Sequence, residues 1–87
     1  MQDIRDIERV AIIGAGLIGS SWAALAMGPG LNVSAYDPAP GAEERFRHAV
    51  ERARGQLAEL GLANTGQYEF TTDLDEALQG VDFVQEN

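Results

Sequence analysis

The chain has 87 residues, enough for one small hydrophobic core. Its formal net charge of -8 argues against nucleic acid and anionic membranes as partners, because the chain repels phosphate overall. It has no cysteine, which excludes disulfides and thiolate metal sites and makes a reduced, cytoplasmic setting the default expectation. Residues 1–9 are charged and predict a short solvated lead-in rather than a signal peptide or a membrane span.

The first expected element is a strand at residues 10–13, where four consecutive apolar residues are typical of a strand buried on both faces. Three glycines follow in the spacing G-x-G-x-x-G, and a helix is predicted over residues 17–27. Gly14 allows a sharp turn, Gly16 lets a pyrophosphate approach the backbone, and Gly19 lets the helix pack close to the sheet. Strand, glycine turn and helix in this order predict a dinucleotide-binding site.

A second apolar run, residues 31–36, predicts another strand and ends in Asp37, eighteen residues after Gly19. The separation is close to the about twenty residues expected for a carboxylate that hydrogen-bonds the adenosine ribose. This carboxylate would repel a 2′-phosphate, and no basic residue follows before Arg45, so NAD is favoured over NADP. FAD uses the same geometry and stays an alternative. The candidate cofactor-binding residues are Gly14, Ala15, Gly16, Leu17, Ile18, Gly19 and Asp37.

Gly28 is expected to end the first helix in a left-handed conformation, and Pro40 is expected to open a second, long helix. The apolar residues of that helix repeat every 3.5 residues, at Phe46, Val50, Ala53, Leu57 and Leu60. Such a narrow seam is typical of a helix paired with another helix rather than one lying flat on a sheet. His48 lies off the seam and is interpreted as a surface residue, not a catalytic one.

Residues 68–71 alternate as a short third strand, and residues 72–80 predict a compact helix capped by Thr72 or Asp73. The acidic residues of its first turn are interpreted as partners of the helix dipole, not as metal ligands. Residues 81–87 begin a fourth strand. The fold class is therefore α/β, the first half of a Rossmann-type parallel sheet with flanking helices. Residues 1–87 are expected to be the N-terminal part of a dinucleotide-binding domain.

The sequence resembles the N-terminal domain of the 3-hydroxyacyl-CoA dehydrogenase family along nearly its whole length. Four short segments carry the resemblance, residues 10–19, 36–38, 71–74 and 82–86, together with the long helix before the third strand. In that family the chain between strands two and three is an extended helical excursion, which would account for this helix. Three further stretches, residues 21–23, 37–45 and 83–86, look most like the branch acting on free 3-hydroxy acids, the L-carnitine dehydrogenases, with L-gulonate dehydrogenase close by.

The resemblance implies NAD-dependent oxidation of the 3-hydroxyl of a 3-hydroxy acid or 3-hydroxyacyl-CoA, in carnitine or fatty-acid metabolism. In that family the catalytic His–Glu pair lies beyond the fourth strand, so no catalytic residue is assigned in this chain. The resemblance also implies a parent protein with a helical C-terminal substrate domain that forms a homodimer. Two alternatives stay open: the dinucleotide domain of another oxidoreductase class, and a non-enzymatic nucleotide-binding module.

Overall fold

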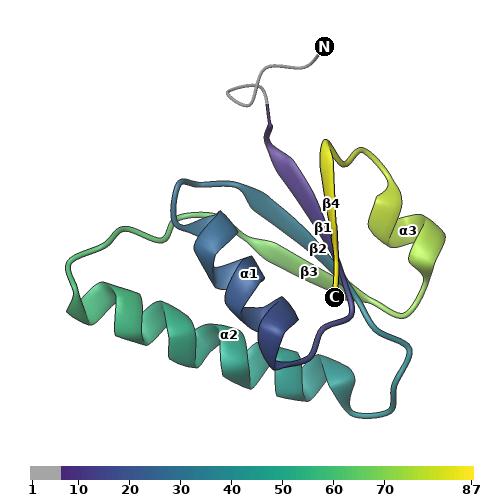
Figure 1. Ribbon diagram of the computed structural model, residues 1–87, viewed down its shortest axis with the longest axis horizontal. Helices are drawn as coiled ribbons and strands as arrows, with labels where there is room; N and C mark the ends of the chain where they lie inside the picture. The colour runs from purple at the N-terminus through teal and green to yellow at the C-terminus, as the bar shows by residue number, and fades with distance from the viewer. Residues whose placement is uncertain (1–6) are drawn as a thin grey trace.

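The computed structural model describes residues 7–87, so most of the expected solvated lead-in lies outside the described residues. Four strands and three helices alternate along this part of the chain (Figure 1). In order they are β1 (Arg9–Ile13), α1 (Leu17–Met27), β2 (Asn32–Tyr36), α2 (Ala42–Glu59), β3 (Tyr68–Thr71), α3 (Leu74–Leu78) and β4 (Phe83–Glu86). The strands are parallel and lie in the order β3-β2-β1-β4, which confirms the predicted half of a Rossmann sheet.

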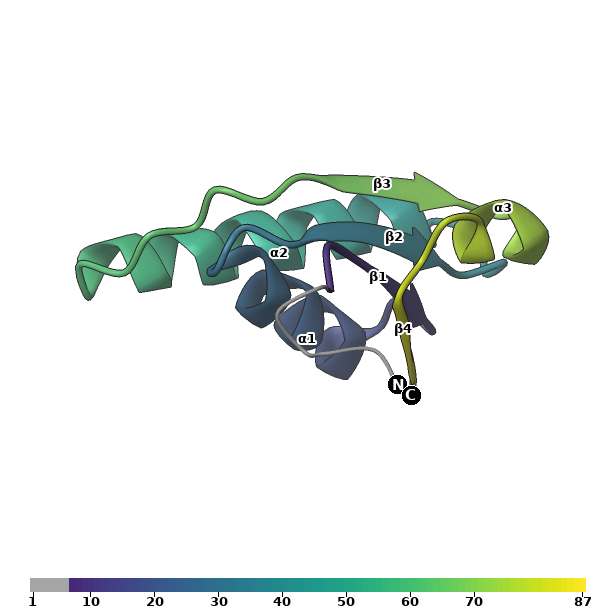
Figure 2. The same cartoon turned by 90° about the horizontal axis from the view of Figure 1, so that it is seen from above.

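The helices cover both faces of the sheet: α1 and α2 lie on one side and α3 on the other (Figure 1). This division follows from right-handed crossovers, because the chain steps one way from β1 to β3 and then returns across the sheet to β4. The C-terminal half of α2 extends beyond the strands (Figure 2). No helix within residues 7–87 combines the length and the apolar character needed to cross a membrane.

The core lies between β1, β2 and the two long helices. Val10 and Ile12 of β1 pack with residues of β2 and with Phe46 and Val50 of α2. The ring of Phe46 is fully buried and lies edge-on to Tyr68 of β3, with the two centroids 5.4 Å apart. The apolar run of β1 is therefore buried as its lack of alternation predicts.

The long helix α2 uses its seam over only part of its length. Phe46 and Val50 are fully buried, whereas Leu60, just past the end of the helix, is 74% exposed. The expected pairing with another helix is confirmed, since α2 packs along α1. Phe46 additionally reaches the sheet at β3, so the helix contacts both layers at its N-terminal half.

Two expectations about helix ends are wrong. Gly28 stays in the right-handed region with φ −53°, and the left-handed residue is Gly30, at φ 97°. The chain makes one more turn first, in which the Gly30 amide donates to the Met27 carbonyl oxygen at 3.0 Å. Pro40 does not open α2, because the left-handed Gly41 caps the helix and Ala42 is its first residue. The expected cap of α3 is confirmed, because the Asp73 side chain accepts a hydrogen bond from the Glu76 amide at 3.2 Å.

Candidate dinucleotide-binding site

The turn between β1 and α1 is built from two glycines in contact. Gly14 has a φ of 93°, a region that side chains disfavour, and its amide donates to the Tyr36 carbonyl oxygen at 2.9 Å. A Cβ on Gly19 would collide with the Gly14 carbonyl oxygen. Gly19 thus allows the first turn of α1 to pack on the glycine turn itself. The sequence predicted that Gly19 lets the helix approach the sheet, whereas the structure shows that it lets the helix approach the Gly14 carbonyl oxygen.

Gly16 caps the N-terminus of α1 and leaves open space in front of it. No side chain caps the helix, and its first turn contains no acidic residue. A Cβ at Gly16 would meet no atom within 4 Å. The first amides of a helix lack intrahelical acceptors and carry the positive end of its dipole. This end of α1 therefore fits an anion such as a pyrophosphate.

Asp37 follows β2 and is tied to the glycine turn. Its Oδ2 accepts a hydrogen bond from the Ala15 amide at 3.0 Å, and its Oδ1 accepts from the Ala39 amide at 2.9 Å. An ionised carboxylate has about four lone-pair sites, so acceptor capacity remains for ribose hydroxyls. The two bonds fix the position of the carboxylate beside the N-terminus of α1.

A cavity of about 260 Å³ joins these elements. Its lining residues are Ala15, Gly16, Leu17, Ser20, Asp37, Ala42, Arg45 and Ala49. The structure therefore brings together four of the predicted site residues, from the glycine turn and the end of β2. Gly14, Ile18 and Gly19 belong to the same turn but do not line the cavity; Gly14 and Gly19 shape it from behind.

Sequence reasoning missed Arg45 and Asn87 as neighbours of this site. Arg45 lies in the first turns of α2 and lines the cavity beside Asp37. Asn87 follows β4; its amide donates to the Ile13 carbonyl oxygen at 3.1 Å and its Nδ2 to the Gly14 carbonyl oxygen at 3.0 Å. The carboxyl ends of parallel strands share one edge, which is the signal that could have placed Asn87 there.

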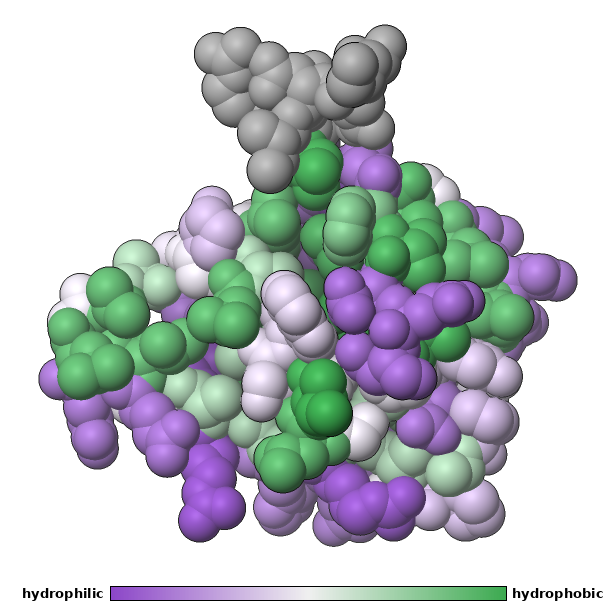
Figure 3. Space-filling model, viewed as in Figure 1, coloured by the Kyte–Doolittle hydropathy of each residue, from purple (hydrophilic) through white to green (hydrophobic). Residues whose placement is uncertain are grey.

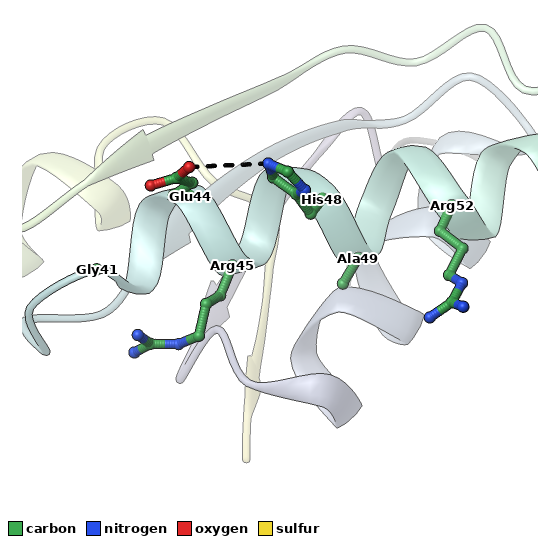
Figure 4. Close-up of a pocket in the computed structure, with 6 residues that line it drawn as sticks. All are labelled: Gly41, Glu44, Arg45, His48, Ala49 and Arg52. Atoms are coloured by element: carbon green, nitrogen blue, oxygen red, sulfur yellow. Dashed lines mark ion pairs between the residues drawn. The ribbon is translucent and has the colours of Figure 1, made fainter.

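A second, wider hollow of about 700 Å³ lies along the exposed side of α2 (Figure 4). Arg45, Ala49 and Arg52 lie along one side of the helix there, and His48 pairs with Glu44 at 3.9 Å. His48 is exposed, as predicted for a surface residue. The groups around this hollow include no nucleophile positioned by a base, so its residues suggest no catalytic centre.

The sheet order, the open helix N-terminus and the fixed carboxylate define a Rossmann-type dinucleotide-binding domain. The family model described as 3-hydroxyacyl-CoA dehydrogenase, NAD binding domain, matches residues 9–87. The chain belongs to this family of NAD-binding domains, and its cofactor is NAD.

Similar proteins agree with this assignment. The L-carnitine dehydrogenase of Streptomyces coelicolor is 42% identical over 90 residues, and that of Pseudomonas syringae pv. syringae is 39% identical. Each alignment covers the whole chain but only 28% of the relative, so the chain spans less than a third of these enzymes. A solved 5-formyl-3-hydroxy-2-methylpyridine 4-carboxylic acid 5-dehydrogenase, an NAD+ dependent dismutase, is 42% identical with a TM-score of 0.85. That match covers 93% of this chain and 28% of the other.

Proposed function

We propose that the glycine turn binds the pyrophosphate of NAD and that Asp37 binds its adenosine ribose. The observation that carries the proposal is the shared cavity, in which Gly16 at the N-terminus of α1 and the carboxylate of Asp37 face one space. The amides of the first helical turn would donate to the pyrophosphate oxygens, with the helix dipole adding to the attraction. Asp37 would accept from the ribose hydroxyls and set the register of the cofactor along the sheet edge.

We propose further that the parent protein oxidises the 3-hydroxyl of a free 3-hydroxy acid of the carnitine type, with 3-hydroxyacyl-CoA as the competing substrate class. The support is the set of relatives named L-carnitine dehydrogenase. The bound NAD supplies the hydride acceptor, and the residues of this chain hold and orient it. The general base that takes the hydroxyl proton is assigned to no residue of this chain.

Three wider expectations are proposals of the same kind. Residues 1–87 form the N-terminal part of the cofactor domain, the parent protein is a homodimer, and it is cytoplasmic. The share of each relative that the chain covers supports the first. Activity of the full-length protein with L-carnitine and with 3-hydroxybutyryl-CoA tests the substrate class. Its mass in solution tests the homodimer, and cell fractionation tests the location.

The cofactor site is tested by titrating the purified chain with NADH and NADPH while following energy transfer from Trp22, with circular dichroism as the check on folding. Wild type should bind NADH in preference to NADPH. Gly16→Ala should fold normally, because its Cβ meets no protein atom, yet lose at least about tenfold in NADH affinity by occupying the pyrophosphate space. Gly55→Ala is the matched control, since its Cβ also enters open space, on α2.

A loss of similar size is expected for Asp37→Ala, which removes the acceptors for the ribose hydroxyls. Equal binding by wild type and by both site variants would contradict the assignment, provided that all of them are folded. Failure of folded wild type to bind NADH would contradict it for this chain directly.

A further inference from the structure

Arg45 is a basic residue on the cofactor cavity whose charge has no partner in the described part of the chain. Three other arginines each pair with a glutamate: Arg9 with Glu69, Arg47 with Glu43, and Arg54 with Glu51. Within residues 7–87, Arg45 makes no such ion pair. An uncompensated guanidinium in an acidic protein is available for an anionic ligand.

The position of Arg45 follows from the way in which α2 begins. The chain turns after Asp37, and α2 starts at Ala42, so Arg45 lies in the first helical turn although it is eight residues further along the chain. Ala42, Arg45 and Ala49 form the α2 wall of the cavity that Asp37 also lines. Figure 4 shows the Arg45 side chain extending from α2 toward the end of the helix at Gly41. Arg52 lies about two turns beyond Arg45 on α2 and lines the wider outer hollow but not this cavity.

We propose that Arg45 is a latent partner for a 2′-phosphate in the adenosine site, and that Asp37 alone keeps such a phosphate out of the wild-type cavity. The inference rests on the proposed placement of the ribose at Asp37. A 2′-phosphate there would meet a carboxylate that two backbone amides hold in place, so Asp37 cannot turn away from it. A guanidinium on the same cavity can bind that phosphate with two parallel hydrogen bonds once the carboxylate is gone.

The position of Arg45 on the cavity changes the physical reason for a preference for NAD. In the sequence, Arg45 is the first basic residue after Asp37 and is eight residues away, too distant to suggest a partner for a 2′-phosphate. In the structure, Arg45 lines the same cavity as Asp37. The preference for NAD therefore depends on the charge of Asp37 and not on the lack of a basic partner.

The experiment compares NADPH and NADH affinities in four forms of the chain: wild type, Asp37→Ser, Asp37→Ser with Arg45→Gln, and Asp37→Ser with Arg52→Gln. Asp37→Ser should bind NADPH at least about tenfold more tightly than wild type does. The added Arg45→Gln change should abolish that gain, whereas Arg52→Gln should leave it in place. No gain in Asp37→Ser, or a gain that survives Arg45→Gln, would overturn the proposal.

A second arm does not require a change at Asp37, whose bonds to two amides support the turn. Arg45→Gln in the wild-type background should change NADPH and NADH affinity by the same factor, because the Asp37 carboxylate still keeps a 2′-phosphate away from position 45. A loss of NADPH binding that exceeds the loss of NADH binding would show that Asp37 does not act alone and would overturn the proposal. Wild-type binding of NADH tests the proposed function separately, so a failure of the cofactor site and a failure of this inference give different results.

Discussion

The two neighbours of strand β1 are anchored in different ways. On one side, Val33 and Ala35 of β2 are fully buried beneath the two long helices, and Phe46 ties this side to β3. On the other side, Phe83 and Val84 of β4 are 50% and 41% exposed. Figure 3 shows apolar surface in several separate patches on the visible face. The β2 side thus gains more of its stability from apolar burial than the β4 side does.

Strand β4 is instead held by polar contacts at both ends. Before the strand, Asp82 Oδ2 accepts from the Glu8 and Arg9 amides at 2.9 and 3.2 Å. After it, Asn87 bonds to Ile13 and Gly14 at the glycine turn. The β2 side of this sheet is therefore a packed unit, whereas β4 depends on its ladder to β1 and on these terminal contacts.

The largest effect is expected from Phe46→Ala, which removes the buried ring that joins α2 to β3. Truncating a buried Phe costs about 3–5 kcal/mol, a large part of the stability of a small domain. Urea unfolding followed by circular dichroism measures the loss. Leu60→Ala is the control near the end of the same helix, where the side chain is 74% exposed and the change should stay within about 0.5 kcal/mol. Similar costs for the two variants would contradict the packed-unit description.

A smaller effect is expected from Asp82→Ala, because two backbone amides lose their acceptor. The expected loss is about 1–2 kcal/mol, and amide hydrogen exchange should rise in β4 before it rises in β2. Asp75→Ala is the control, because it removes the same charge from the first turn of α3. It should lower the free energy of unfolding by less than about 1 kcal/mol. If amide hydrogen exchange rose equally in β2 and β4 of the Asp82→Ala variant, the claim that the two strands are anchored in different ways would be contradicted.

The smallest effect on folding is expected from Phe83→Ser. The side chain lines a largely apolar groove of about 320 Å³ with Trp22 and Leu25, but it is already half in solvent. Unfolding should change by less than about 1 kcal/mol, while binding of an apolar dye such as ANS should fall. Leu62→Ser, at an exposed apolar side chain outside the groove, should reduce dye binding less.

The sequence predicted the local elements well where one short segment contains all the information. The helix at residues 17–27 matches α1 residue for residue, and Gly14 makes the sharp turn that the spacing predicts, whereas Gly19 contacts the Gly14 carbonyl oxygen rather than the sheet. The placement of Asp37 beside that turn was also predictable, because adjacent parallel strands end at the same edge.

What could not be predicted depends on contacts between distant segments. The helical period of α2 continues to Leu60, but how far that seam is covered depends on where α1 and β3 lie. The same holds for Trp22, which lines the apolar groove but stays 47% exposed. Arg45 reaches the cavity beside Asp37 through tertiary structure, which no local pattern encodes.

The contrast between Gly16 and Gly19 has a consequence for how this protein tolerates sequence change. Every side chain at position 19 meets the Gly14 carbonyl, so a screen for folded protein and a selection for cofactor-dependent growth should reject the same variants there. At position 16 the first atom of a side chain enters open space, so the screen should accept small residues that the selection rejects. The two glycines of one motif would then tolerate different substitutions, because Gly19 is required for folding and Gly16 is required for binding of the ligand.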